Sequence, residues 1–248
     1  MPDDRLALPM AQTVVNPVSP VHPPEPLAAR YARMAHDGLE PRTVDGVLRV
    51  LDVLIALVAL VVCSLPMAAI VISLRLDSPR ASALYRGRRV GRAGQIFTMV
   101  KFRTLRPDAE ARLGPFMGTE LDRLTEDEMT RLGSFLRVSK LDELPQLWNV
   151  LRGDMSIVGP RPIRPIFFEQ LSQEIPQYWQ RLVVAPGLTG FAQMRIRRDM
   201  SWAEKLAHDF EYIADRSVGL YLLVVAETVA LILTGPFRRL WVRLRGGG

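Results

Sequence analysis

The chain has 248 residues, enough for one domain of ordinary size or one domain with appendages. Its 32 basic and 26 acidic residues give a formal net charge of +6, and nearly all of the positive charge is arginine because the chain has only three lysines. A basic balance favours partners that carry phosphate, such as nucleic acid, anionic lipid or a nucleotide. The single cysteine, Cys63, excludes an intrachain disulfide and a metal site built from several cysteines.

Residues 1–45 are rich in proline and contain no apolar block. This composition predicts a disordered cytoplasmic tail, because such a segment has too little apolar surface to bury. No apolar core follows a basic start, so we do not expect a signal peptide here.

A long apolar segment, Val47–Leu76, follows the tail. It carries no charged residue between Asp52 and Arg75, and that length is sufficient for one helix to cross a bilayer. Pro66 lies within the segment, where it removes a backbone donor and clashes with the preceding turn, so we expect a kink.

Two arrangements of this segment are open. In a straight crossing, the tail and the main domain lie on opposite sides of the membrane, and composition alone favours this arrangement. In a re-entrant hairpin, the segment enters the membrane, breaks near Ser64, Leu65 and Pro66, and returns. The hairpin would place two pairs of charged residues at the same interface, namely Arg49 with Asp52 and Arg75 with Asp77.

The next part of the chain, residues 78–135, has the composition of a soluble domain. Two strand-like runs within Tyr85–Leu105 flank Gly91 and Gly94, which predicts a β-hairpin. The stretch Pro107–Leu136 is first acidic and then amphipathic, and we expect a helix that ends near Arg137.

Further elements follow. Ile163–Leu182 is predicted to be helical, and Ala185–Arg198 is predicted to be a glycine-punctuated loop that leads into a basic segment. Ser201–Asp215 has an amphipathic pattern, with Ser201 and Glu204 in the spacing of a capping box. Val218–Leu233 is apolar but short and interrupted, so it either lies at a membrane interface or packs as a core helix. The arginine-rich and Trp-containing end suits an anchor on an anionic leaflet.

The chemistry is concentrated in the stretch Val138–Pro162, where Asp142 and Glu143 are adjacent at the predicted start of a short helix. Neighbouring helical residues point about 100° apart, so these carboxylates need not act on the same atom. One could face a substrate phosphorus while the other holds a divalent cation such as Mg²⁺, which takes carboxylate and phosphate oxygens. The alternative is an acidic pair that only stabilises a helix start.

Cationic residues surround this pair in the sequence. Arg137, Arg152 and Arg161 offer the planar guanidinium fork that binds phosphate, and two prolines stiffen the backbone on either side of Arg161. Lys101 follows a predicted strand, where it either binds phosphate or is a simple exposed lysine. It is equally open that Arg161 forms an ion pair with a nearby carboxylate instead of binding phosphate. The arginines show no nucleic-acid-binding pattern, so nucleic acid is not an expected partner.

Five stretches together resemble the bacterial sugar transferases, which are monotopic phosphoglycosyl transferases acting on polyprenyl phosphate. These stretches are LRVLDV (Leu48–Val53), the proline-broken apolar segment, RRVGRAGQIFTMVKFRT (Arg88–Thr104), LDELPQLWNVLRGDMSIVGPRP (Leu141–Pro162) and PGLTGFAQ (Pro186–Gln193). The resemblance covers roughly residues 47 to 222.

The resemblance implies an α+β, mostly helical fold with a small β-hairpin, anchored to the membrane by a proline-broken re-entrant helix. The implied organisation is a tail (1–45), a re-entrant helix (46–76), a cytoplasmic catalytic domain (77–222) and an apolar and basic interfacial segment (223–248). It thus replaces the straight crossing that composition alone favours.

The resemblance also implies roles for single residues. Asp142 matches the nucleophile of the family and Glu143 its Mg²⁺ ligand, while Lys101, Arg137 and Arg161 match positions near the phosphates of the nucleotide-sugar. We also assign three further residues to the substrate site, namely Arg152, Gln193 and Arg197. After Gln193 the family commonly continues Val-x-Gly-Arg, whereas this chain has Met194-Arg195-Ile196-Arg197 and lacks the glycine.

The implied reaction transfers a phosphosugar from a UDP-sugar to polyprenyl phosphate through a phosphosugar-aspartate, with Mg²⁺ as cofactor and UMP as product. Such an enzyme would work at the cytoplasmic face of the bacterial inner membrane, in contact with lipid, and would start a surface polysaccharide or glycoconjugate. The identity of the sugar, self-association and contacts with downstream glycosyltransferases stay open. The alternative is a non-catalytic membrane protein that binds nucleotide-sugar or organises a partner.

Overall fold

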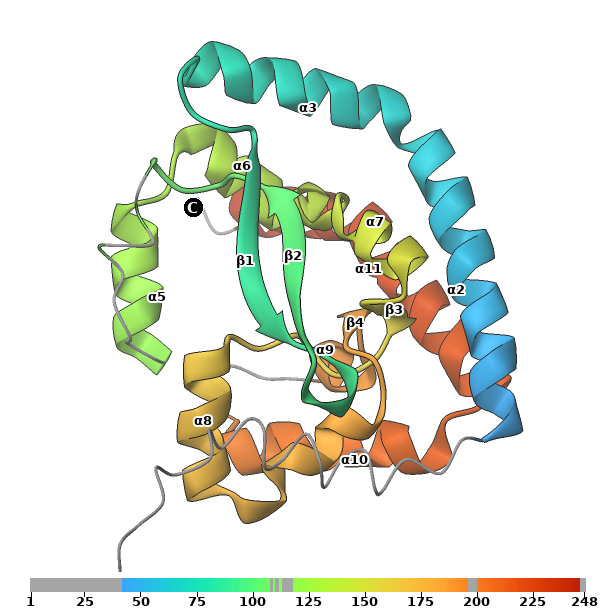
Figure 1. Ribbon diagram of the computed structural model, residues 1–248. Coiled ribbons are helices and arrows are strands. Elements are labelled where there is room, and N and C mark those ends of the chain that lie inside the picture. The colour runs from blue at the N-terminus through green and yellow to red at the C-terminus, as the bar shows by residue number, and fades with distance from the viewer. Residues whose placement is uncertain (1–41, 108, 110–111, 113–117, 196–199, 246–248) are drawn as a thin grey trace, which may run out of the picture.

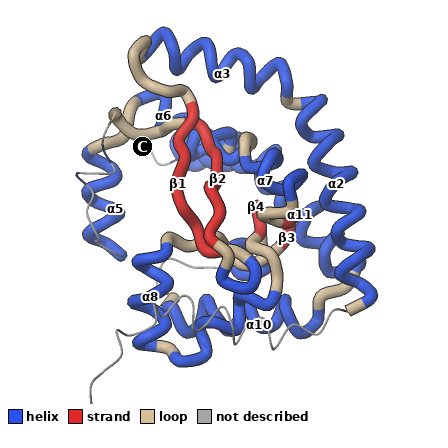
Figure 2. Tube along the Cα trace, in the orientation of Figure 1, coloured by secondary structure: helices blue, strands red, loops and turns tan. Residues whose placement is uncertain are grey.

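The computed structural model describes residues 42–107, 109, 112, 118–195 and 200–245 of the chain. Within these residues the fold has the predicted α+β class, because it is mostly helical with two small two-stranded sheets (Figures 1 and 2). The α-helices are α2 (Thr43–Val62), α3 (Ser64–Asp77), α5 (Gly118–Asp127), α6 (Arg131–Ser139), α7 (Gln146–Arg152), α8 (Pro165–Glu174), α9 (Phe191–Arg195), α10 (Trp202–Asp215) and α11 (Val218–Arg245). The strands are β1 (Leu84–Val90), β2 (Ile96–Phe102), β3 (Ser156–Val158) and β4 (Gly187–Thr189), and short 3-10 turns are η1 (Arg92–Gly94), η2 (Leu141–Glu143) and η3 (Pro176–Val183).

The apolar segment forms a bent pair of helices, α2 and α3, with an angle of 61° between them. No single helix of the described residues is long and apolar enough to span a membrane, whereas this bent pair passes that test of length and composition. The bend lies at Cys63, and the predicted break residues Ser64, Leu65 and Pro66 form the first turn of α3. Proline is tolerated there because the first amides of a helix have no partner within it.

One face of α2 packs onto the rest of the protein. Leu48, Asp52 and Ala56 recur at helical spacing and are buried, and α2 contacts α7 and β3. The Asp52 carboxylate accepts hydrogen bonds from the amide of Ile157 (2.7 Å) and the hydroxyl of Tyr221 (2.8 Å). The hairpin arrangement placed Asp52 with the other charged residues at the membrane interface, whereas the structure buries it inside the protein. Asp52 is only 4% exposed and joins three elements inside the protein.

The predicted β-hairpin is confirmed. Strands β1 and β2 pair antiparallel, with Tyr85 opposite Lys101 and Arg89 opposite Phe97. Gly94 in the connecting turn has a φ of 71°, a conformation that glycine adopts without strain. Figure 1 shows the hairpin at the centre of the molecule, with α3 passing over the end where β1 begins.

The described residues of the segment before the acidic pair contain the helices α5 and α6, where one helix ending near Arg137 was predicted. Thr130 caps α6, since its hydroxyl accepts a hydrogen bond from the amide of Gly133 (2.9 Å). A side chain at Gly133 would meet the carbonyl oxygen of Thr104, so the glycine allows α6 to approach the end of β2 closely. This contact places Arg137 beside Thr104.

The predicted helix Ile163–Leu182 is interrupted. Helix α8 ends at Glu174, and the segment continues as the 3-10 turn η3 from Pro176, because proline disfavours helix in the residue before it. The predicted loop Ala185–Arg198 contains strand β4 and helix α9. Strand β4 pairs in parallel with β3, which connects two segments that are distant in sequence. The sequence offered no period-two pattern long enough to predict these three-residue strands.

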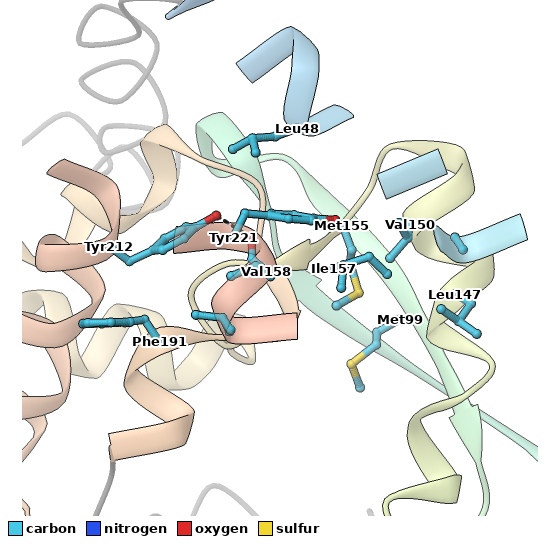
Figure 3. Close-up of a cluster of buried hydrophobic side chains, with 12 residues drawn as sticks. Leu48, Met99, Leu147, Val150, Met155, Ile157, Val158, Phe191, Tyr212 and Tyr221 are labelled. Carbon is cyan, nitrogen blue, oxygen red and sulfur yellow. Dashed lines mark hydrogen bonds between the residues drawn. The ribbon is translucent and has the colours of Figure 1, made fainter. Parts of the chain in front are cut away.

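The two C-terminal helices complete the core. The capping box of α10 is confirmed, because the Ser201 hydroxyl and the Glu204 carboxylate each accept a hydrogen bond from the other residue's backbone amide. Helix α11 runs without a break across the predicted boundary at residues 222 and 223. Its first turns pack in the core through Tyr221 and Val224, and Figure 3 shows Tyr221 in the same cluster as Leu48.

Candidate active site

The acidic pair lies in the sharp turn between α6 and α7. Lys140 has a left-handed backbone with φ 62°, which ends α6, and the 3-10 turn Leu141–Glu143 follows directly. The pair diverges as predicted, since Glu143 forms an ion pair that Asp142 does not share. Asp142 is only 4% exposed, and among the residues that the structure describes no hydrogen bond reaches its carboxylate.

The environment of Asp142 disfavours its charge. Burial, reinforced by the neighbouring Glu143 carboxylate, raises the pKa of Asp142 above its usual value, although Lys101, Arg137 and Lys140 oppose this shift. A buried carboxylate without a hydrogen-bond donor is poorly solvated and costly to keep ionised. Such an environment is typical of reactive carboxylates.

Glu143 belongs to a different network. The Arg161 guanidinium donates to Glu143 (3.1 Å) and to the side-chain oxygen of Gln193 (3.0 Å). Burial alone would raise the pKa of Glu143, but the charges of Arg161 and Lys140 outweigh it and hold the pKa below its usual value. Glu143 is therefore ionised at neutral pH.

A buried ion pair supports the backbone of Arg161. Arg181 contacts the Asp209 carboxylate at 2.9 Å and donates to the Tyr178 hydroxyl (2.6 Å) and to the carbonyl oxygen of Arg161 (2.9 Å). Close backbone packing fixes the same loop, because a side chain at Gly159 would meet the carbonyl of Ala185. Arg161 thus projects from a rigid backbone, although its own side chain is 56% exposed.

Lys101 lies on β2 opposite Tyr85, with its ammonium 5.3 Å from the ring centre. The adjacent strand residue is tied to α7, because the amide of Val100 donates to Asn149 (3.0 Å). Burial, reinforced by the charge of Arg137, lowers the pKa of Lys101 to about 8. The lysine therefore remains mostly protonated at pH 7.

Lys101 and Arg137 line a cleft of about 1000 Å³. Its described lining includes eight cationic side chains and no Asp or Glu. These are Arg80, Arg86, Arg89, Lys101, Arg103, Arg106, Arg137 and Arg164. The Arg137 guanidinium donates to the Thr104 hydroxyl (3.0 Å), which orients it in this lining. A low-dielectric cleft of one sign attracts and orients a polyanion, and a diphosphate has the matching charge.

The structure brings most of the predicted site residues together. The charges of Arg137, Asp142 and Arg161 all influence the pKa of Lys101. Arg161 donates hydrogen bonds to both Glu143 and Gln193 and so links these two residues. Arg197 lies outside the described residues. Arg152 is not brought to the cleft, because it ends α7 and pairs with Asp154 (3.4 Å) on the surface.

The sequence analysis did not identify Arg103, Thr104 or Arg181 as part of this region. Arg103 could have been found, because it is a cation only two residues from Lys101 in the sequence. Arg181 could not, because its contacts with Arg161 and Asp209 depend on the tertiary fold.

We compared the chain with known proteins. Residues 44–235 match the family model for bacterial sugar transferases. The chain belongs to the bacterial sugar transferase family. It is 40% identical over 181 residues to a UDP-glucose:undecaprenyl-phosphate glucose-1-phosphate transferase of Caulobacter vibrioides, which covers 68% of this chain and 62% of that relative.

Two further relatives are informative. The family member is 37% identical over 201 residues to the exopolysaccharide production protein ExoY of Sinorhizobium fredii, with coverage of 77% of this chain and 88% of the relative. It is 36% identical over 173 residues to a UDP-N-acetylgalactosamine-undecaprenyl-phosphate N-acetylgalactosaminephosphotransferase of Aeromonas hydrophila, with coverage of 68% and 39%. The chain therefore spans less than two thirds of the Caulobacter and Aeromonas relatives.

Proposed function

We propose that this sugar transferase moves a sugar 1-phosphate from a UDP-sugar to polyprenyl phosphate, such as undecaprenyl phosphate, and releases UMP. One observation carries the proposal. Asp142 is a buried carboxylate without a hydrogen-bond donor among the described residues, and it lies beside two cations, Lys101 and Arg137, that line a large cationic cleft. The names of the relatives support this substrate class, and ExoY supports a role in starting an exopolysaccharide.

In the first step, an Asp142 carboxylate oxygen attacks the phosphorus that bears the sugar. A bond forms between this oxygen and phosphorus, and the bond from phosphorus to the bridging oxygen breaks, so UMP leaves with that oxygen. Lys101 and Arg137 would hold the phosphate oxygens, and the fork of Arg161 would take part of the charge that develops on the diphosphate.

In the second step, a phosphate oxygen of the polyprenyl phosphate attacks the same phosphorus. The phosphorus–Asp142 bond breaks, the carboxylate is regenerated, and the product is a polyprenyl diphosphate-sugar. Covalent catalysis of this kind divides one difficult displacement into two easier ones.

The residues present fit a role for Mg²⁺. Glu143 is ionised, and Mg²⁺ is commonly bound by one or two carboxylates together with substrate phosphates and water. Among the described residues no group of three or more acidic, His or Cys side chains gathers around a common point. Glu143 would therefore hold the ion jointly with the diphosphate, where its positive charge would stabilise the leaving UMP.

We further propose that the bent pair α2–α3 enters the membrane from the cytoplasmic face and returns to it. Both ends of the pair contact the same domain, since Arg42 donates to the carbonyl of Ala214 and Arg103 donates to that of Leu74. The region around the bend exposes large apolar side chains, which would be costly to leave in water. They are Leu54, Leu57, Val58, Val61, Val62, Leu65, Val71, Ile72 and Leu76.

The test is UMP release from a panel of UDP-sugars with Mg²⁺ and undecaprenyl phosphate. We expect release by the wild type with at least one sugar, and none above background by Asp142→Asn. Asp215→Asn is the matched control, because Asp215 is exposed at the end of α10, and it should behave as the wild type. If the wild type binds a UDP-sugar but releases no UMP with any sugar, the proposal is wrong and the protein is a non-catalytic binder.

A further inference from the structure

Among the residues that the structure describes, Arg103 is a buried cation without a counter-charge. Its side chain lines the cleft but is only 8% exposed, and its Nη2 donates a hydrogen bond to the carbonyl oxygen of Leu74 (3.2 Å). The second terminal nitrogen, Nη1, is buried and has no partner, and Arg103 forms no ion pair among the residues that the structure describes. A buried charge without compensation is strongly unfavourable in the folded protein.

The position of Arg103 separates it from the site at Asp142. Arg103 follows Lys101 by two residues and lies one residue beyond the end of β2 at Phe102. The amide of Arg103 donates to the carbonyl of Ala83 (2.9 Å), which fixes it against the loop that follows α3. Arg80 belongs to this loop, is exposed and lines the same cleft.

We propose that the α3 end of the cleft, built on Arg103 with Arg80, is a separate subsite for a phosphate monoester carried by a lipid. A monoester has up to two negative charges on one phosphorus, and the arginine fork is suited to its oxygens. The subsite rests on the proposed function, because it would hold the acceptor phosphate close to the phosphorus bound at Asp142.

The surroundings favour a lipid as the source of this phosphate. Arg103 is bonded to the last turns of α3, and α3 belongs to the helix pair that exposes its apolar side chains. A phosphate attached to a long hydrocarbon would thus reach Arg103 from the apolar surface.

The two half-reactions provide the test. Without acceptor, the purified protein should release about one UMP per active site. We expect Arg103→Gln to keep this burst and the KM for UDP-sugar within about twofold, while the apparent KM for undecaprenyl phosphate rises at least about tenfold, as for loss of a charge-assisted hydrogen bond. Arg80→Gln should raise the same KM by a smaller factor. Arg88→Gln is the control, because Arg88 is exposed on β1 and does not line the cleft, and it should leave both KM values unchanged.

A rise in the KM for UDP-sugar with no change for the acceptor would overturn the proposal and assign Arg103 to the donor. Unchanged KM values for both substrates in Arg103→Gln and in Arg80→Gln would also overturn it. If Arg103→Gln does not fold, the KM values of Arg80→Gln alone decide.

A wild type that gives no UMP burst would show that the proposed function is wrong. A binding measurement tests the subsite independently of that function. In detergent micelles, farnesyl phosphate should raise the Tm of the wild type, and farnesol should not. The shift should be lost in Arg103→Gln or, failing its folding, reduced in Arg80→Gln. An equal shift with inorganic phosphate at the same concentration would contradict a lipid source, and no shift with farnesyl phosphate would contradict the subsite.

Discussion

Two regions of the molecule bury charge, and they do so in opposite ways. In the first region, behind the loop that carries Arg161, the buried Arg181 meets the Asp209 carboxylate, the Tyr178 hydroxyl and a backbone carbonyl, which leaves only its Nε without a partner. Its charge is matched within the protein. Such a pair holds a structure in place and has no charge left for a ligand.

The second region is the cationic cleft together with Asp142 beside it. Asp142 is buried without a hydrogen-bond donor among the described residues, Arg103 has a buried and unpartnered Nη1, and the pKa of Lys101 falls to about 8 because burial and Arg137 disfavour its charge. A fold that can match a charge at Arg181 leaves these groups unmatched. Under the proposed function, the charges of the substrates would supply these missing partners.

The largest expected effect is the loss of activity when Asp142 is replaced. Asp142→Asn should lower the rate of UMP release by about 10³-fold or more, because the nucleophile is lost. The same change should raise the Tm at pH 7, since burial raises the pKa of Asp142 and folding therefore disfavours its ionised form.

The pH dependence of this Tm difference follows from the direction of the pKa shift. A raised folded pKa means that this destabilisation is present above the folded pKa and disappears as the pH falls through it towards the unfolded value. The Tm difference between Asp142→Asn and the wild type should therefore shrink in acid. A Tm of Asp142→Asn well below that of the wild type at pH 7 would contradict an unmatched charge at this position.

In the first region, replacing the buried carboxylate should destabilise the protein instead of stabilising it. Asp209→Asn should lower the free energy of unfolding by about 3–5 kcal/mol, because Arg181 then keeps a buried charge without a counter-ion. Urea denaturation measures this value. The matched control is Glu211→Gln, which breaks the exposed pair with Arg195 and should lower the free energy of unfolding far less. Equal losses in the two variants would mean that burial does not distinguish these pairs.

A smaller effect is expected in the pH dependence of activity, through the ionisation of Lys101. If its protonated form binds phosphate, kcat/KM for the UDP-sugar should fall above a pH of about 8 and approach a tenfold loss per pH unit. Lys101→Arg should move this alkaline limb to higher pH, because arginine stays protonated throughout the range. An alkaline limb at the same pH in both proteins would assign it to another group.

Local patterns predicted the parts of the fold that depend on neighbours in sequence. The hairpin follows from two strand-like runs around Gly91 and Gly94, and the start of α10 follows from Ser201 and Glu204. The structure brings together Asp142, Lys101 and Arg137, which the sequence indicated through residue chemistry and family resemblance.

Contacts between distant segments could not be predicted in this way. Asp52 looked like an interfacial charge, but the fold surrounds it with donors from β3 and α11. Two partners of Arg181, Arg161 and Asp209, lie 20 residues before it and 28 residues after it, and no periodicity connects them. The unmatched state of Arg103 is likewise visible only when all of its neighbours are known.

The most direct test of the central claim is the intact mass of the protein after incubation with Mg²⁺ and the UDP-sugar that supports turnover, without lipid acceptor. The account predicts an added mass of one sugar 1-phosphate, located on the peptide that contains Asp142, absent from Asp142→Asn and lost when undecaprenyl phosphate is added. Turnover without any such adduct on rapid quenching, or an adduct that persists in Asp142→Asn, would contradict Asp142 as the nucleophile.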